Sequence, residues 1–190
     1  PPPPPTTHTT TQNIPASTDP ADYGYELLAL DVTDEESMVA AADAVADPHG
    51  AVGALVNNAG YSQSGAIEDL PMESIRRQFE TNVFGLIRMS QLVLPGMREQ
   101  RAGRIVNIGS MGGKLSFPGG GIYHATKYAV EAISDVLRFE VSNFGVKVVL
   151  VEPGLIKTNF ADAALSHMDT PSQTDGAYDD FNAAVAKNTA

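Results

Sequence analysis

Residues 104–127 read RIVNIGSMGGKLSFPGGGIYHATK, and this stretch decides the fold class. An apolar run ends at Ile108, a glycine-rich loop follows to Gly121, and a helical pattern begins at Tyr123. A short apolar run bounded by glycine is typical of a buried strand, and apolar residues at helical spacing indicate a helix. The same alternation continues on both sides of this stretch. It predicts an α/β fold, a Rossmann-like parallel sheet with helices on both faces.

The other elements are placed by the same patterns. Strands are predicted over residues 26–32, 53–57, 104–108 and 146–152. Helices are predicted from an N-cap at Thr33 to about Ala46, from Pro71 to about Leu94 where Pro95-Gly96 ends it, and over 123–144. Ligands of such sheets bind beyond the carboxyl ends of the strands. Polar and turn residues gather at those ends, which predicts a site there: Asp31, Asn57, Asn58, Gly109, Ser110, Pro153 and Gly154.

Composition narrows the class of function. The chain has 190 residues, no cysteine and a net charge of −11 at pH 7. The negative charge argues against nucleic acids and anionic membranes, and the lack of cysteine excludes disulfides and thiolate metal sites. No metal site is predicted. No apolar run is long enough to span a membrane and no signal peptide is recognisable, so a cytoplasmic protein is expected.

Two regions differ in composition. Residues 1–22 are rich in proline and threonine and are expected to form a disordered leader, with a proline-rich ligand for a partner domain as the less favoured alternative. Residues 23–190 are expected to form one partial domain, in which residues 155–190 make a substrate-loop region.

Three positions carry candidate chemistry. Tyr123 and Lys127 are four residues apart on one helix face, and a nearby ammonium would lower the pKa of the phenol toward neutrality. The same spacing is also common on solvated helix faces. Ser110 either binds a substrate oxygen or bonds its own turn. Asn82, in the middle of a helix, either serves the site or satisfies a neighbouring backbone group.

Several motifs, in order along the chain, resemble one family. They are Asn57-Asn58-Ala59-Gly60, Asn82, Ser110 thirteen residues before Tyr123-His124-Ala125-Thr126-Lys127, and Pro153-Gly154 with Thr158 after it. From about Tyr25 to Thr158 the sequence strongly resembles the short-chain dehydrogenase/reductase family. The resemblance implies an oxidoreductase that moves a hydride between NAD or NADP and a secondary alcohol or carbonyl substrate.

The resemblance also implies a role for each matching residue. Tyr123 would be the general acid/base, Lys127 would lower its pKa and hold the nicotinamide ribose, Ser110 would orient the substrate oxygen, and Asn82 would hold a water that links Lys127 to solvent. Further cofactor contacts are implied at the adenine, the adenosine ribose and the nicotinamide: Asp31, Val32, Asn58, Ala59, Gly60, Pro153, Gly154, Ile156 and Thr158. His124 is expected to pack beside the site. Dimers or tetramers through the two long helices are implied as well.

The sequence departs from the family at its start. A complete member opens with a glycine-rich turn that holds pyrophosphate at a helix N-terminus, but Gly24 is the one glycine before Asp31. The family's first two strands and its last strand are also lacking. We therefore expect weak NAD(P) binding, an unstable monomer, and a remnant sheet of the later three strands with strand 26–32 displaced or paired abnormally.

Two readings of function from different classes stay open. The chain is an oxidoreductase or a fragment of one, or it is a catalytically impaired association module or truncated gene product. The choice between NAD and NADP is open, because the residue that usually sets it is lacking. The apolar residues after Gly154 either form a lid for a hydrophobic substrate or simply pack the loop: Leu155, Ile156, Phe160, Leu165 and Met168.

Overall fold

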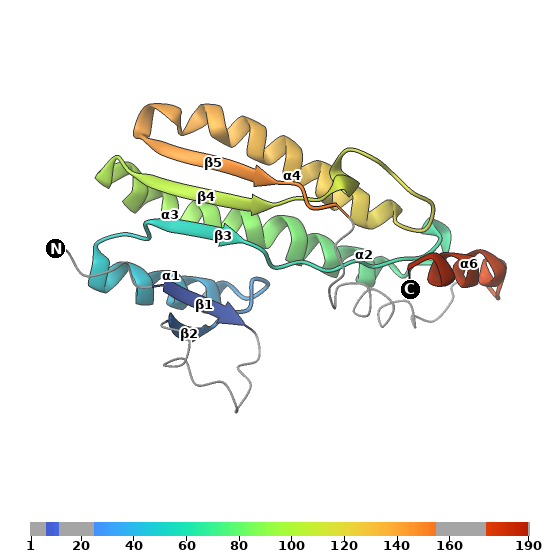
Figure 1. Cartoon of the computed structure of the whole chain (residues 1–190). Helices are drawn as coiled ribbons and strands as arrows, with labels where there is room; N and C mark the ends of the chain where they lie inside the picture. Colours follow the sequence, from blue (N-terminus) through green and yellow to red (C-terminus); the bar gives the residue numbers. More distant parts are fainter. Residues whose placement is uncertain (1–6, 12–24, 155–173, 190) are drawn as a thin grey trace.

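The computed structural model describes residues 7–11, 25–154 and 174–189 (Figure 1). Its strands are β1 (Thr7–Thr11), β2 (Tyr25–Ala29), β3 (Ala54–Asn57), β4 (Gly103–Ile108) and β5 (Val146–Val151). Its longer helices are α1 (Glu35–His49), α2 (Met72–Phe79), α3 (Gly85–Gln100), α4 (Gly121–Glu140) and α6 (Asp179–Thr189). Short helical turns are η2 (Ile67–Asp69), η3 (Glu80–Phe84), η4 (Met111–Gly113) and η5 (Ser142–Phe144).

The main sheet has the order β3–β4–β5, and both pairings are parallel. Asn57 pairs with Asn107, and Ile108 pairs with Val151, so the three strands end side by side. The loops that leave these ends therefore start from one edge of the sheet, as Figure 1 shows. The prediction of an incomplete Rossmann-like parallel sheet is confirmed, including the remnant sheet of the three later strands.

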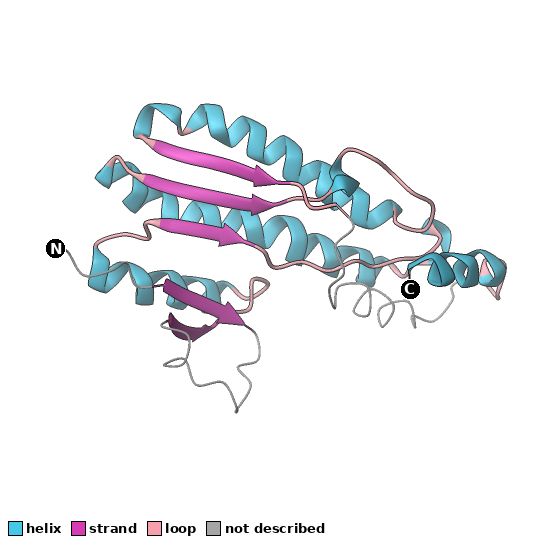
Figure 2. Cartoon of the chain, in the orientation of Figure 1, coloured by secondary structure: helices cyan, strands magenta, loops and turns pink. Residues whose placement is uncertain are grey.

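α3 and α4 cover one face of this sheet (Figure 2). Every second residue of β4 and β5 points into the core, where Ile105 and Val146 meet Val93 and Met97 of α3. On the opposite face, Val56, Val149 and Val151 are exposed. The sequence predicts helices on both faces of the sheet. Within the described residues, helices cover one face. The difference arises because α1, α3 and α4 all pack on that same side.

The strands β1 and β2 form a separate parallel pair. Their register runs from Thr7 opposite Tyr25 to Thr11 opposite Ala29. The structure thus differs from the expected disordered leader at Thr7–Thr11, because the backbone of a threonine run pairs readily in a strand. Strand 26–32, predicted to be displaced or paired abnormally, is seen as β2, which pairs with β1 and lies outside the three-stranded sheet.

Two helices differ from the sequence prediction at prolines. The helix of residues 72–100 runs through Pro95, and its C-cap is Arg101 with φ of 53°. Val93 and Met97 flank this proline and are buried, and their packing outweighs the hydrogen bond that Pro95 cannot donate. In the same way α1 continues through Pro48 and ends at Gly50.

Two helix starts also shift. The N-cap of α1 is Asp34, whose carboxylate accepts from the Ser37 amide at 3.0 Å. The predicted cap, Thr33, instead donates its hydroxyl to Asp31 at 2.7 Å, which leaves the capping role to the next residue. The helix predicted over 123–144 begins at Gly121 and ends at Glu140, with η5 and Gly145 after it.

In the described part of the chain, no helix is long and apolar enough to cross a membrane.

Candidate active site

The site is built at the carboxyl end of β4, where residues 109–120 form what we call the serine loop. Its backbone is tied to the end of β5, because the Gly109 amide donates to Val151 at 2.8 Å and the Met111 amide donates to Pro153 at 3.0 Å. Ser110 caps η4, and its hydroxyl oxygen accepts from the Gly112 amide at 3.0 Å. Ser110 thus bonds its own turn, which is one of the two roles that the sequence suggested. Its hydroxyl proton stays available for another acceptor.

Lys127 lies one turn after Tyr123 on α4 and its side chain is buried. The ammonium donates to the Ile108 carbonyl at 2.8 Å and lies 5.8 Å from the centroid of the Tyr123 ring. Burial lowers the pKa of Lys127 to about 8, because water no longer solvates the charged form. Lysine and tyrosine thus face one another across the end of β4.

The pKa of the Tyr123 phenol is raised, chiefly by burial, and a hydrogen bond with Ser110 opposes this rise only in part. This differs from the expectation that Lys127 would lower it. The lysine ammonium sits over the ring face rather than at the hydroxyl, and burial makes the charged form of the lysine less stable. At neutral pH the structure therefore holds a protonated phenol in contact with the Ser110 hydroxyl.

Asn82 lies in η3, a π-helical turn between α2 and α3. Such a turn has one extra residue per hydrogen-bonded ring and often occurs at functional sites. The Asn82 amide accepts from the Tyr61 amide at 3.1 Å and donates to the Tyr61 carbonyl at 2.9 Å and to Thr126 at 3.1 Å. A Cβ atom on Gly60 would lie 3.2 Å from Asn82 Oδ1 and 3.9 Å from Lys127 Nζ. Asn82 and Lys127 thus approach the same glycine.

The predicted cofactor contacts lie mostly along the same edge. Asn58, Ala59 and Gly60 follow β3 and are exposed, and among the described residues no atom lies within 4 Å of a Cβ added to Gly154 after β5. Pro153 is half-buried. Open, side-chain-poor surface of this kind fits a ligand that approaches the backbone closely.

The remaining predicted contacts are spread more widely. Asp31 accepts from Thr33 and sits after β2, outside the main sheet, while Val32 packs against Gly85 at the start of α3. Ile156 and Thr158, like the apolar loop from Leu155 to Met168, lie outside the described residues.

A polar network under the sheet was not anticipated from the sequence. Asn57 donates to Asn107 at 2.9 Å, and Asn107 donates to Ser134 at 2.9 Å, which joins β3, β4 and α4. Ser90 of α3 accepts from Asn57 at 3.3 Å. The signal in the sequence was Asn107, a polar residue at an inward position of an apolar strand. This network fixes α3 and α4 against the strands that carry the site.

An ion cluster holds the outer side of the serine loop. The Lys114 ammonium lies 2.6 Å from Glu131 of α4 and 3.2 Å from Glu152 after β5. Burial raises the pKa of the Glu131 carboxyl, and Lys114 opposes that rise. The cluster links the loop to both neighbouring elements.

Across the described ranges, no three histidine, aspartate or glutamate side chains gather as a metal site would require.

An open groove of about 580 Å³ lies beside the serine loop. Its walls are mostly apolar and include Ile67, Phe117 and Phe181. α6 is held over it by polar bonds, since Asn182 donates to Asp69 at 3.0 Å and the Tyr178 hydroxyl donates to Glu68 at 2.6 Å. Gly121, two residues before Tyr123, lines the same groove. Apolar space thus borders the start of the helix that carries the tyrosine.

Comparison with known proteins places these residues in a family. Residues 7–169 match the family described as short chain dehydrogenase. The uncharacterised oxidoreductase YusZ of Bacillus subtilis is 42% identical over 155 residues, which cover 82% of this chain and 55% of that protein.

Solved structures agree. A short-chain dehydrogenase from Streptomyces avermitilis has a TM-score of 0.77 and 44% identity, with 81% of this chain and 59% of that chain covered. ElxO with NADP bound has a TM-score of 0.75 and 28% identity, with 85% and 67% covered. The chain spans about half the length of the curated relatives it matches.

Proposed function

Since the chain belongs to the short-chain dehydrogenase family, we propose that it forms the proton-transfer half of an oxidoreductase that acts on a carbonyl or secondary alcohol. The observation that carries the proposal is the contact between the protonated Tyr123 phenol and Ser110, with Lys127 across the ring. A phenol and a hydroxyl side by side are suited to hold one carbonyl oxygen, which both can donate to. Tyr123 is in the protonated form that reduction of a carbonyl requires, and burial, which raises its pKa, favours that form further.

Each residue then has one task. Tyr123 gives its proton to the carbonyl oxygen as the C–O double bond becomes a single bond, and Ser110 holds that oxygen. Lys127, with a pKa of about 8, is mostly charged at pH 7 and would hold the nicotinamide ribose. Asn82 fixes the Tyr61 backbone beside Gly60 and keeps open the approach from solvent to Lys127.

The exposed strand ends fit a nicotinamide cofactor in part. When bound, such a cofactor supplies the hydride that the carbonyl carbon accepts. Asn58, Ala59, Gly60 and Gly154 would hold it, because they offer backbone with little side chain in the way. Asp31, Val32, Pro153, Ile156 and Thr158 stay proposed contacts, as do Tyr123 and Lys127. NADP, which ElxO holds, and NAD are both compatible with these residues.

The groove beside Gly121 supports a hydrophobic substrate. Ile67, Phe117 and Phe181 offer apolar contacts next to the helix start that bears Tyr123. We propose that the substrate's carbonyl lies at Ser110 and Tyr123 and its apolar part in this groove. The division of the chain at residue 23 and a cytoplasmic location stay predictions.

The test compares two tyrosines of the same helix. Reduction of acetophenone and of a medium-chain methyl ketone is followed by the absorbance of NADPH and NADH, with cofactor binding measured by calorimetry. Tyr123→Phe is expected to lower turnover by about 100- to 10,000-fold and to leave cofactor affinity nearly unchanged. Tyr128→Phe is the matched control, since Tyr128 is exposed on α4 and is expected to keep full activity. Most of the rate surviving in Tyr123→Phe would exclude the proposed role.

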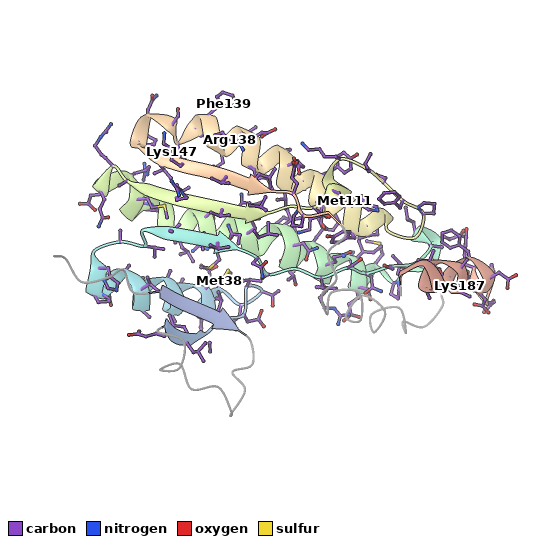
Figure 3. The ribbon with its side chains drawn as sticks, in the orientation of Figure 1. Met38, Met111, Arg138, Phe139, Lys147 and Lys187 are labelled. Atoms are coloured by element: carbon purple, nitrogen blue, oxygen red, sulfur yellow. The ribbon has the colours of Figure 1, made fainter. Side chains whose placement is uncertain are left out.

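A second candidate function is association with another copy through α4. Tyr128, Val136 and Phe139 are exposed and lie on one side of the helix, as their spacing requires. Figure 3 shows Phe139 projecting from α4 away from the sheet. Exposed aromatic and branched residues in a row are typical of an interface. Phe139→Glu is expected to lower the mass measured by light scattering from an oligomer to a monomer, and a wild-type monomer at all concentrations would contradict it.

A further inference from the structure

The buried His124 occupies the space between the serine loop and the start of α4. Its side chain is 7% exposed, although it lies next to the proposed proton donor in the sequence. Cβ atoms on Gly112 and Gly120 would lie 2.6 Å from its two ring nitrogens, so the loop leaves room for the imidazole only because these positions are glycine. Its ring meets the Tyr123 ring edge-on at a centroid distance of 5.7 Å.

The two ring nitrogens have backbone partners of opposite kind. Nε2 lies 3.1 Å from the Phe117 amide, which can only donate. Nδ1 lies 3.0 Å from the Gly112 carbonyl, which can only accept. These two partners fit an imidazole that carries its proton on Nδ1 and a lone pair on Nε2. A doubly protonated ring would set an N–H group against the amide of Phe117, and the opposite tautomer would set a lone pair against the carbonyl of Gly112.

These bonds lead from His124 to the reacting groups. His124 bonds the carbonyl of Gly112, and the amide of the same residue, in the preceding peptide group, donates to the Ser110 hydroxyl oxygen at 3.0 Å. That bond occupies part of the oxygen's accepting capacity and orients the Ser110 hydroxyl, which is hydrogen-bonded with Tyr123 and can turn its proton to a substrate oxygen. One side chain thus sets the orientation of both donors to the substrate oxygen.

We propose that His124 is a positioning residue for the proton transfer, which it supports as the neutral Nδ1–H tautomer by fixing Gly112 and, through it, Ser110 against Tyr123. This role rests on the proposed function, because it matters only if Ser110 and Tyr123 handle the substrate oxygen. It extends that function to a residue which touches neither substrate nor cofactor. Phe117, the second anchor of the ring, also lines the apolar groove, so the same histidine links the groove wall to the site.

The first test reads the tautomer and needs no activity. Nitrogen-15 NMR of the full chain with labelled histidine distinguishes a protonated Nδ1 from a protonated Nε2. The His124 signals are assigned by their absence from His124→Gln. At neutral pH we expect Nδ1 protonated and Nε2 bare. A predominantly protonated Nε2, or signals of an imidazole that averages both forms in water, would overturn the proposal.

The second test reads Tyr123 itself. Carbon-13 NMR of labelled tyrosine gives the pKa of its phenol, assigned by Tyr123→Phe. Ser110→Ala should raise this pKa, because it removes the hydrogen bond that opposes burial. His124→Ala should raise it as well and lower turnover on the order of 10- to 100-fold with cofactor affinity unchanged. His124→Asn, whose amide reaches the Gly112 carbonyl, should recover part of both losses.

The control is Val130→Ala, which removes methyl groups from a fully buried position of the same helix. It should leave the Tyr123 pKa and the tautomer as they are. An equal shift in Val130→Ala and His124→Ala would reduce His124 to general packing and overturn the proposal. If Ser110→Ala shifts the pKa and His124→Ala does not, only the positioning role fails. If Ser110→Ala and Tyr123→Phe both leave turnover intact, the proposed function itself fails.

Discussion

The two parallel sheets of this molecule are held by different means. β4 and β5 bury one face at Ile105 and Val146, Leu55 of β3 packs against the same core, and a polar network joins the strands to the helices beneath. β1 and β2 pair over five residues and contact α1 only weakly, with Glu26 and Ala29 exposed. Parallel pairing by itself is weak, so a sheet of this kind depends on the faces that it buries.

This difference divides the proposed site. Ser110, Tyr123, Lys127 and Asn82 stand on the well-packed sheet and its helices, whereas Asp31 follows the weakly packed strand β2. The residues proposed for proton transfer and the residue proposed for adenine binding thus stand on regions that are packed to unequal degrees. The following predictions test this division.

The largest effect on the free energy of unfolding is expected when one apolar residue of each sheet is replaced by alanine. Ile105→Ala should lower the free energy of unfolding by about 2–5 kcal/mol, because Ile105 is fully buried. Leu28→Ala in β2 should cost less than about 1 kcal/mol, because Leu28 is only half-buried and its sheet has two strands. Urea unfolding followed by circular dichroism measures both. Equal losses would mean that β2 belongs to the same cooperative unit as β4.

A smaller effect on the free energy of unfolding, a gain rather than a loss, is expected when Lys127 is replaced. Lys127→Met should raise the free energy of unfolding at pH 7 by roughly 1–3 kcal/mol while it abolishes turnover, because the variant no longer buries a charge. Below pH 8 the lysine is charged in both folded and unfolded chains, so its burial cost is present in full. Between about 8 and its ordinary pKa of 10.5 the folded protein loses the proton first, and wild-type stability rises.

The advantage of Lys127→Met should therefore shrink as the pH rises from 8 to 10.5. Thermal unfolding of both proteins across this range measures it. An advantage that stays constant with pH would mean that the burial of charge is not its source.

The smallest effect is expected in a comparison of ligands. NADPH and reduced nicotinamide mononucleotide should bind with affinities within about tenfold, or roughly 1.4 kcal/mol. The residues before Asp31 offer no glycine-rich turn for the pyrophosphate, and their strand is held weakly. Calorimetric titration of this chain measures both affinities. A preference for NADPH above about 100-fold, with micromolar binding, would show that the adenosine side contributes fully.

The same division explains what the sequence could predict. The ends of β3, β4 and β5 and the spacing of Tyr123 and Lys127 follow from local patterns of apolar and turn residues, and the structure brings them to one edge. β1 could not be predicted, because a threonine run among prolines carries no apolar period and its partner is remote in sequence.

Other details depend on packing that local patterns do not contain. Pro95 stays inside α3 because its neighbours Val93 and Met97 reach the core. The raised pKa of Tyr123 arises from burial, which spacing along a helix does not reveal. The bonds of His124 to Gly112 and Phe117 depend on the path of a loop that glycines leave undetermined from sequence.

The parallel pairing of β3 with β4 has a consequence for how the chain is made. Asn57 finds its partner Asn107 only 50 residues later, and within the described residues β3 pairs with no earlier strand. At about 5–20 residues per second, the ribosome needs roughly 3–10 s to complete that interval. Throughout it β3 is without β4, the strand with which it pairs in the described residues, and we expect its apolar run to be open to association with other chains. The speed of translation between β3 and β4 thereby becomes a determinant of folding yield.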